Sequence, residues 1–154
     1  MPFRRLVQAV DEWARANPSV EVMAQVGVDP SFRPAALTAF ASVTPAKYAE
    51  LVQSCELVVA HAGMGSVLTA LEHGKPMILM PRRGHLQETR NDHQSATLRW
   101  LCRKPGIYAA QDEAELKAAL DDWRLRGVTP PPNSADHRTD SLDSLVSTLR
   151  AFIG

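Results

Sequence analysis

The sequence predicts an α/β protein with a parallel sheet of about five strands and helices on both of its faces. Short apolar segments rich in Val, Ile and Leu alternate along the chain with segments whose apolar residues repeat at helical spacing. The segments 57–60 and 77–80 are apolar at every position, which is typical of strands that are buried on both faces. A turn and a helix join these two strands, so we expect a strand–helix–strand unit with a right-handed crossover.

The composition indicates one globular domain and excludes several classes of protein. A chain of 154 residues is long enough for one domain with a hydrophobic core but not for two. The formal net charge is zero, so the chain lacks the excess of positive charge that is typical of proteins that bind nucleic acid or an anionic membrane. The longest apolar runs are too short to span a membrane, and no signal peptide opens the chain.

The cysteines and histidines give no sign of a disulfide or a metal site. Cys55 and Cys102 have no motif partners, and we expect free thiols in a reducing cytoplasm. The five histidines show no spacing typical of metal ligands, so we expect no structural metal.

Five helices are predicted before residue 127, and local signals mark several of their ends. Thr44 followed by Pro45 is an N-cap with proline at the first helical position. Gly74, with Pro76 just beyond it, is expected to be the residue that follows a helix in the left-handed conformation. Asp112 is expected to cap a later helix. The predicted helices span about 3–17, 45–55, 65–73, 92–104 and 113–123.

Five strands are predicted between these helices, and the end of the chain departs from the alternation. The strands span about 20–26, 36–43, 57–60, 77–80 and 107–110. The segment 127–139 holds three consecutive prolines and is predicted to be an extended crossing. It leads to a last helix with an apolar stripe formed by Leu142, Leu145, Val146, Leu149 and Phe152. We therefore divide the chain into 1–126, the domain proper, and 127–154, which packs on that domain or on a partner.

The turn after the strand 57–60 is a candidate anion site. Gly63 and Gly65 allow a tight turn and a close approach of the backbone to a ligand. The helix that follows directs unpaired backbone N–H groups and the positive end of its dipole towards the carboxyl edge of the sheet. His61 ends the strand and can donate to the same anion, and Ser66 adds a hydroxyl. Strand–glycine turns without a ligand also occur in many α/β proteins, so the residues alone leave both readings open.

The segment from His61 to Gln94 resembles a known family. Its motifs are His61-Ala62-Gly63-Met64-Gly65-Ser66, then Gly74-Lys75-Pro76, then Pro81, then Asn91-Asp92-His93-Gln94. They are similar to those of the C-terminal domain of glycosyltransferase family 28, and the likeness covers about residues 3–123. It implies a Rossmann-like domain, the C-terminal half of a GT-B glycosyltransferase. It also implies that the family's first strand, which precedes the helix that opens this chain, is missing, so that one sheet edge is exposed, differently covered or paired with another chain.

The resemblance also implies roles for individual residues. The catalytic role falls on His61, and the diphosphate of a UDP-sugar is expected at Gly63, Met64, Gly65 and Ser66. The sugar hydroxyls are expected at Asn91, Asp92, His93 and Gln94. Asn91 and Asp92 can at the same time serve as the cap of the following helix.

Two groups of residues qualify this assignment. Many relatives place a Glu that grips the ribose hydroxyls where this chain has Thr69, and a threonine cannot accept two hydroxyls as a carboxylate does. Glu72 lies one turn later, and solvation explains it as well as a compensating role does. Arg82, Arg83 and Arg90 are candidates for contacts with the diphosphate or a partner, with ordinary solvated loop side chains as the alternative.

The function implied by the resemblance is that of a donor-binding subunit of an inverting hexosyltransferase. Within the family, the sequence resembles soluble subunits of split enzymes that make bacterial exopolysaccharides or extend dolichol-linked sugars. We accordingly expect no cofactor beyond the UDP-sugar donor, a lipid-linked acceptor and a membrane-anchored partner that supplies the general base. The chain is expected to be cytoplasmic, recruited to the membrane's inner face, and inactive alone. The alternatives are a non-catalytic or regulatory partner module and a UDP-sugar 2-epimerase-like enzyme.

Overall fold

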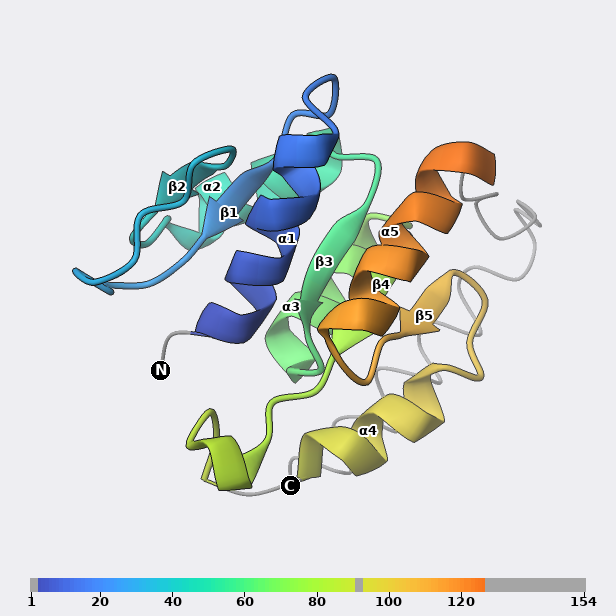
Figure 1. Cartoon of the computed structure of the whole chain (residues 1–154). Helices are drawn as coiled ribbons and strands as arrows, with labels where there is room; N and C mark the ends of the chain where they lie inside the picture. The colour runs from blue at the N-terminus through green and yellow to red at the C-terminus, as the bar shows by residue number, and fades with distance from the viewer. Residues whose placement is uncertain (1–2, 91–92, 127–154) are drawn as a thin grey trace.

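The computed structural model describes residues 3–90 and 93–126. Strands and helices alternate along these residues (Figure 1). The elements in chain order are α1 (Arg4–Ala16), β1 (Met23–Gln25), β2 (Thr38–Phe40), α2 (Pro45–Ser54), β3 (Val58–His61), α3 (Met64–Glu72), β4 (Met77–Met80), the 3-10 turn η1 (Gly84–Leu86), α4 (His93–Leu101), β5 (Ile107–Ala109) and α5 (Glu113–Arg126). The predicted α/β class is confirmed. The segment 127–154, with its predicted crossing and last helix, lies outside the described residues.

All five described strands are in parallel pairs, but they form two ladders and not one. β1 pairs with β2, and β3, β4 and β5 form a three-stranded sheet in that order. The predicted parallel pairing is confirmed, and the five strands are divided between these two ladders. Val22, beside β1, and Val59, in β3, both pack on the apolar cluster of α1, so the two ladders share a core. Tertiary packing, and not a ladder of hydrogen bonds, joins them in the described part of the chain.

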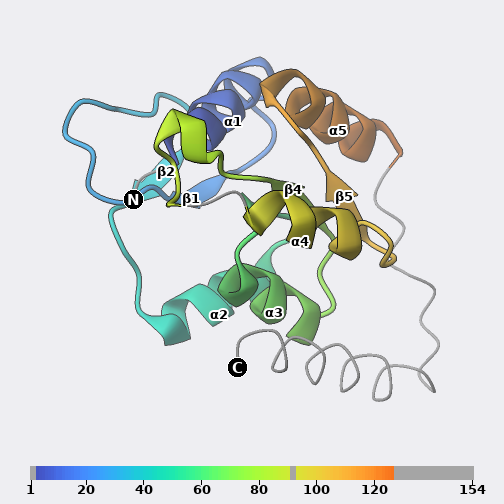
Figure 2. The same cartoon turned by 90° about the horizontal axis from the view of Figure 1, so that it is seen from below.

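The core lies on both faces of β4, as its uninterrupted apolar sequence predicts. Ile78 and Met80 belong to a cluster with α1 and α5, whereas Met77 and Leu79 belong to a cluster with α3 and α4. All four side chains are almost completely buried. Figures 1 and 2 show the resulting layers, with α1 and α5 on one side of the sheet and α2, α3 and α4 on the other.

Several predicted helix ends are confirmed in atomic detail. The hydroxyl oxygen of Thr44 accepts a hydrogen bond from the backbone N–H of Lys47 at 3.2 Å. Asp112 accepts one from the backbone N–H of Glu115 at 2.8 Å. Gly74 has a φ of 62°, which favours glycine, and the bonds from its N–H to Leu71 and from Lys75 to Ala70 close the end of α3.

The first two strands are much shorter than predicted. The segment 20–26 contributes only Met23–Gln25, and the segment 36–43 contributes only Thr38–Phe40. Val20, Val22, Ala24 and Val26 are still better buried than the residues between them, so the predicted alternation is correct. The parallel pairing of β1 with β2 extends over three residues. Beyond them the segments exchange only the bonds from Thr38 N–H to the Val22 carbonyl and from Val26 N–H to the Phe40 carbonyl, each at 2.9 Å, while the alternation of side chains continues.

Polar contacts fix α1 within the fold. The carboxylate of Asp11 is buried and accepts the backbone N–H groups of Ala35 at 3.0 Å and Ala36 at 2.8 Å. The indole N–H of Trp13 donates to Asp121 of α5 at 2.8 Å. These bonds connect the loop between β1 and β2, and the last described helix, to the helix that lies over the sheet. No helix within the described ranges is long and apolar enough to cross a membrane.

Candidate anion-binding site at the start of α3

The predicted glycine turn forms the start of α3 at the carboxyl edge of the sheet. β3 ends at His61, Gly63 occupies the N-cap position, and the helix begins at Met64. The first intrahelical bond runs from the N–H of Val67 to the carbonyl of Gly63 at 3.3 Å. The N–H groups of Met64, Gly65 and Ser66 therefore have no partner within the helix, and they provide donors and a positive dipole end for an anion.

The two glycines of the turn serve different purposes. A Cβ at Gly63 would lie 2.0 Å from Cε1 of His61 and 2.6 Å from its Nδ1, so the imidazole occupies the space that a side chain would need. A Cβ at Gly65 would meet nothing within 4 Å. Gly63 is therefore required by the packing of His61, whereas Gly65 leaves the approach to the helix N-terminus open.

His61 is a half-buried imidazole held in its neutral form. Burial lowers its pKa from the ordinary value of 6.5, and the positive charge of Arg82 lowers it further, while the interaction with Gln94 opposes both. Its Nδ1 atom is buried and has no hydrogen-bond partner among the described residues. A buried ring nitrogen without a partner is unusual, and it makes His61 a candidate for a functional role.

Gln94 joins the separate parts of the site. Its side-chain oxygen accepts the backbone N–H of Arg82 at 3.0 Å, and the same side chain interacts with the imidazole of His61. The ends of β3 and β4 and the first turn of α4 are thereby brought together. Gln94 therefore lies between His61 and the loop 82–90 that carries the three candidate arginines, here called the arginine loop. The roles of these residues towards a ligand stay predictions.

The structure separates the three candidate arginines. The guanidinium of Arg82 lies over the ring of Phe3 at 5.2 Å and donates to the carbonyl of Glu88 at 3.1 Å. Burial lowers the pKa of Arg82, and the charge of Glu88 opposes this shift. Arg83 extends the other way and donates to the carbonyl of Gln111 at 2.6 Å, and Arg90 is exposed. Of the three, Arg82 is the one whose charge acts on His61.

The remaining predicted residues differ in where they lie. Met64 and Ser66 are half-buried in the first turn of α3. The hydroxyl of Thr69 donates to the carbonyl of Gly65 at 3.0 Å, so its proton is engaged within the helix. Asn91 and Asp92 lie outside the described residues, and His93 begins α4 without a described side chain.

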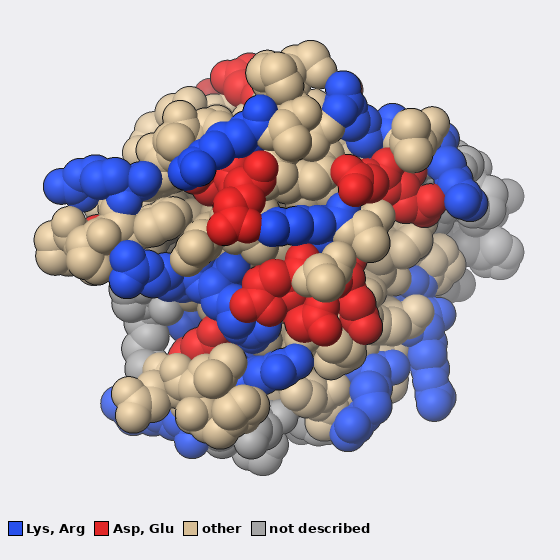
Figure 3. All heavy atoms as spheres, in the orientation of Figure 1, with Lys and Arg blue, Asp and Glu red and all other residues tan. Residues whose placement is uncertain are grey.

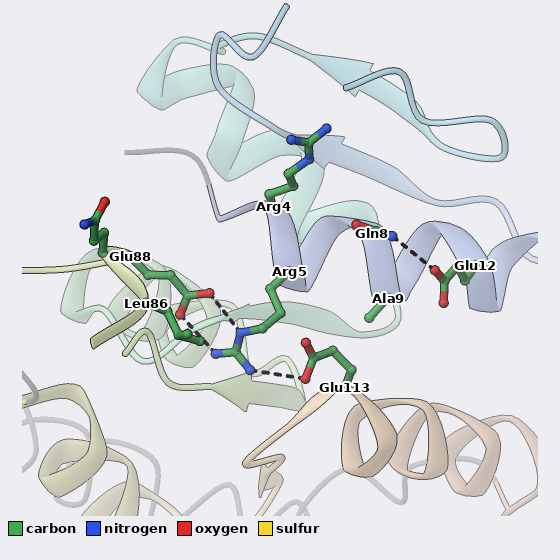
Figure 4. A pocket seen from close by; sticks show the side chains of 9 residues that line it. Arg4, Arg5, Gln8, Ala9, Glu12, Leu86, Glu88 and Glu113 are labelled. Carbon is green, nitrogen blue, oxygen red and sulfur yellow. Dashed lines mark hydrogen bonds and ion pairs between the residues drawn. The ribbon is translucent and has the colours of Figure 1, made fainter. Parts of the chain in front are cut away.

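A pocket of about 530 Å³ lies beside the arginine loop (Figure 4). It is lined by Arg4, Arg5, Gln8, Ala9, Glu12, Leu86, Gln87, Glu88 and Glu113. None of these residues belongs to the predicted site, so the pocket does not coincide with the start of α3. Acidic and basic side chains are interleaved over this face of the molecule (Figure 3), which presents no field of one sign.

Sequence reasoning assigned no role to Arg5 and Phe3. Both belong to the amphipathic pattern of the first helix, and their contacts with the arginine loop span at least 75 residues of sequence. Glu88 opens the stretch up to Gln94 that resembles the exopolysaccharide branch of the family, but its pairing with Arg5 has no local sequence signal.

Comparison with known proteins agrees with the resemblance seen in the sequence. The model of the glycosyltransferase family 28 C-terminal domain matches residues 2–144. Among solved structures, the chain is similar to the crystal structure of the glycotransferase of kitacinnamycin, with a TM-score of 0.58 and 22% identity. That match covers 94% of this chain and 34% of the other, so the chain spans about a third of the length of this neighbour. A search of curated proteins found no match.

Proposed function

The chain belongs to glycosyltransferase family 28 through its C-terminal domain, and from this premise we propose that it binds the UDP-sugar donor of a hexosyl transfer reaction. The observation that carries the proposal is the convergence of the α3 N-terminus, His61 and Gln94 at one edge of the sheet. Ligands of parallel α/β sheets bind at the carboxyl ends of the strands. The site therefore lies where the fold places ligands, and its groups are suited to an anion.

In the proposed reaction, the start of α3 holds the diphosphate of the donor. The backbone N–H groups of Met64, Gly65 and Ser66 and the helix dipole stabilise the negative charge that develops on the leaving diphosphate. His61 donates a hydrogen bond to a phosphate oxygen, and Arg82 contributes a positive charge beside it. Gln94, with the neighbouring residues 91–93, is proposed to meet the sugar hydroxyls.

The acceptor and the general base are proposed to come from a second polypeptide. This chain spans only about a third of the length of its structural neighbour, and none of the predicted site residues that the structure describes is a carboxylate. The family resemblance supports a membrane-anchored partner and a lipid-linked acceptor in exopolysaccharide synthesis. Under this proposal the chain acts at the inner face of the membrane and transfers no sugar alone.

A second candidate is a nucleotide-sugar-binding module without turnover. It is favoured by Thr69, whose hydroxyl proton is engaged by the carbonyl of Gly65. The side chain retains acceptor capacity for one ribose hydroxyl but does not supply a carboxylate. Donor binding is common to both candidates, and only turnover distinguishes them.

Calorimetric titration with UDP and a panel of UDP-sugars tests donor binding. We expect saturable binding by the wild-type chain and none by Gly65→Val, because the valine side chain would enter the open space before the helix N-terminus. Gln53→Val, at an exposed helical position of α2, is the control and should bind as wild type does. Equal UDP affinity of Gly65→Val and wild type would remove the diphosphate from this site.

A further inference from the structure

A partly buried ion pair joins α1 to the loop that follows β4 (Figure 4). The guanidinium of Arg5 donates to both oxygens of Glu88, from Nε at 2.8 Å and from Nη2 at 3.0 Å. The two side chains are 13% and 11% exposed. Two parallel N–H···O bonds fix orientation as well as distance. The pair therefore holds the loop at one position relative to α1.

Glu88 also organises the loop from within. Its carboxylate accepts the backbone N–H of Arg83 at 2.9 Å, and its own N–H donates to the carbonyl of Arg83 at 3.2 Å. Its carbonyl accepts Nη1 of Arg82 at 3.1 Å. One residue thus closes the loop onto its own beginning and provides the atom on which the Arg82 guanidinium rests.

The position of Arg82 is further fixed by Phe3. The guanidinium groups of Arg82 and Arg5 lie over this ring at 5.2 Å and 5.4 Å from its centre. The backbone of Arg82 donates to Gln94, which interacts with His61. The contacts of Glu88 therefore continue through Arg82 to the imidazole that ends β3.

We propose that Glu88, held by Arg5, is a positioning residue that places the Arg82 guanidinium beside His61 for interaction with the anionic part of the ligand. The inference rests on the proposed function, since it takes that anion to be the donor's diphosphate. In a purely structural role, the same ion pair would only stabilise the packing of the loop against α1. The two roles predict different effects at His61.

The pKa of His61, measured without any ligand, distinguishes the positioning role of Glu88 from a purely structural one. The positive charge of Arg82 lowers this pKa. In Glu88→Gln the charged fork to Arg5 is lost, so the loop is no longer fixed against α1, and the Glu88 carbonyl that holds the Arg82 guanidinium can move away from the sheet edge. The pKa of His61 should then rise towards its ordinary value in an NMR titration. Arg5 still has the carbonyl of Pro81 at 3.1 Å and the carboxylate of Glu113 at 3.4 Å as partners, so we expect the variant to fold.

Asp121→Asn is the matched control for a general loss of stability. It weakens the hydrogen bond between Trp13 and Asp121, which also fixes α1 but lies in its second half, away from the loop. This variant should lower the melting temperature and leave the His61 pKa as in wild type. An unchanged His61 pKa in Glu88→Gln, or an equal change in Asp121→Asn, would overturn the positioning role.

A double-mutant cycle on UDP affinity completes the test. Glu88→Gln in the wild-type background should weaken UDP binding about ten-fold, the usual scale for one charge-assisted contact. In an Arg82→Gln background the same substitution should have almost no effect, because Glu88 acts through Arg82. Additive losses in the double variant would refute the positioning role of Glu88 but not donor binding. Absence of UDP binding by the wild-type chain would refute the proposed function, and the His61 pKa measurement would then decide on Glu88.

Discussion

The imidazole of His61 lies directly over Gly63, so that a Cβ at Gly63 would stand 2.0 Å from Cε1 of the ring. The strand end, the glycine turn and the start of α3 are therefore one packed unit. The glycine is required here by a neighbouring side chain, and not by its own backbone, whose φ of −92° any residue can adopt.

Gly63→Ala should displace the imidazole and weaken both the fold and anion binding. Overpacking of this kind costs about 1–3 kcal/mol, which thermal unfolding will measure. UDP affinity should fall in parallel because His61 leaves its position. Gly65→Ala is the matched control. Its Cβ enters open space, and the free energy of unfolding should rise by up to about 1 kcal/mol because alanine favours a helix over glycine. Similar stability of the two variants would contradict the packing argument.

UDP binding should be coupled to proton uptake by His61. The folded protein holds the pKa of His61 below its ordinary value, mainly through burial, and a bound anion stabilises the charged form. Affinity should therefore increase as the pH falls from 7.5 towards 6. Calorimetry in buffers of different ionisation enthalpy measures the protons taken up. The nucleotide's own phosphate titrates too, so the informative quantity is the difference between wild type and His61→Gln, and equal proton uptake by the two would contradict the coupling.

Stability should show the opposite pH dependence at the same residue. A histidine whose pKa is lowered in the folded state stabilises the fold above its unfolded pKa. That contribution is lost as the pH falls through the region between the unfolded and folded values. The unfolding free energy of wild type should thus decline below about pH 6.5 more steeply than that of His61→Gln in urea denaturation series. Parallel pH profiles would show that burial does not hold the imidazole neutral.

Thr69→Glu should improve recognition of the ribose. The resemblance places a ribose-binding carboxylate at this position in many relatives, and a carboxylate can accept both ribose hydroxyls. We expect the variant to bind UDP about ten-fold more tightly, with little change for 2′-deoxy-UDP. Gln53→Glu, which adds the same charge at an exposed position of α2, is the control and should alter neither affinity. A gain for both nucleotides alike would indicate a general electrostatic effect.

Asp11→Ala should destabilise the fold without touching the anion site. The variant leaves the N–H groups of Ala35 and Ala36 without the buried carboxylate that accepts them. Each such loss costs about 1–3 kcal/mol, so urea denaturation should show a decrease of roughly 2–4 kcal/mol in unfolding free energy. Glu21→Ala, at an exposed position, should differ from wild type by less than about 0.5 kcal/mol. A stability for Asp11→Ala close to that of the control would show that water replaces the carboxylate.

The local features of this protein were determined by its sequence. The apolar segments predicted at 57–60 and 77–80 form the strands Val58–His61 and Met77–Met80, because they suit burial on both faces. Thr44, Gly74 and Asp112 end or begin helices as predicted, since caps depend on residues within four positions of one another. The glycine turn after His61 and its place before a helix follow from the same short-range rules.

Only the tertiary structure decided how these elements are connected. The division of the strands into two ladders depends on which backbones become neighbours, and periodicity does not encode this. Asp11 in the helical pattern gave no sign of binding a loop 24 residues away. Likewise, nothing in the sequence distinguished Arg82 from Arg83. In the structure Arg82 contacts Glu88 and Phe3, whereas Arg83 donates to Gln111. Contacts between residues far apart along the chain form when packing brings the elements together, and that packing selects which of several similar side chains faces the site.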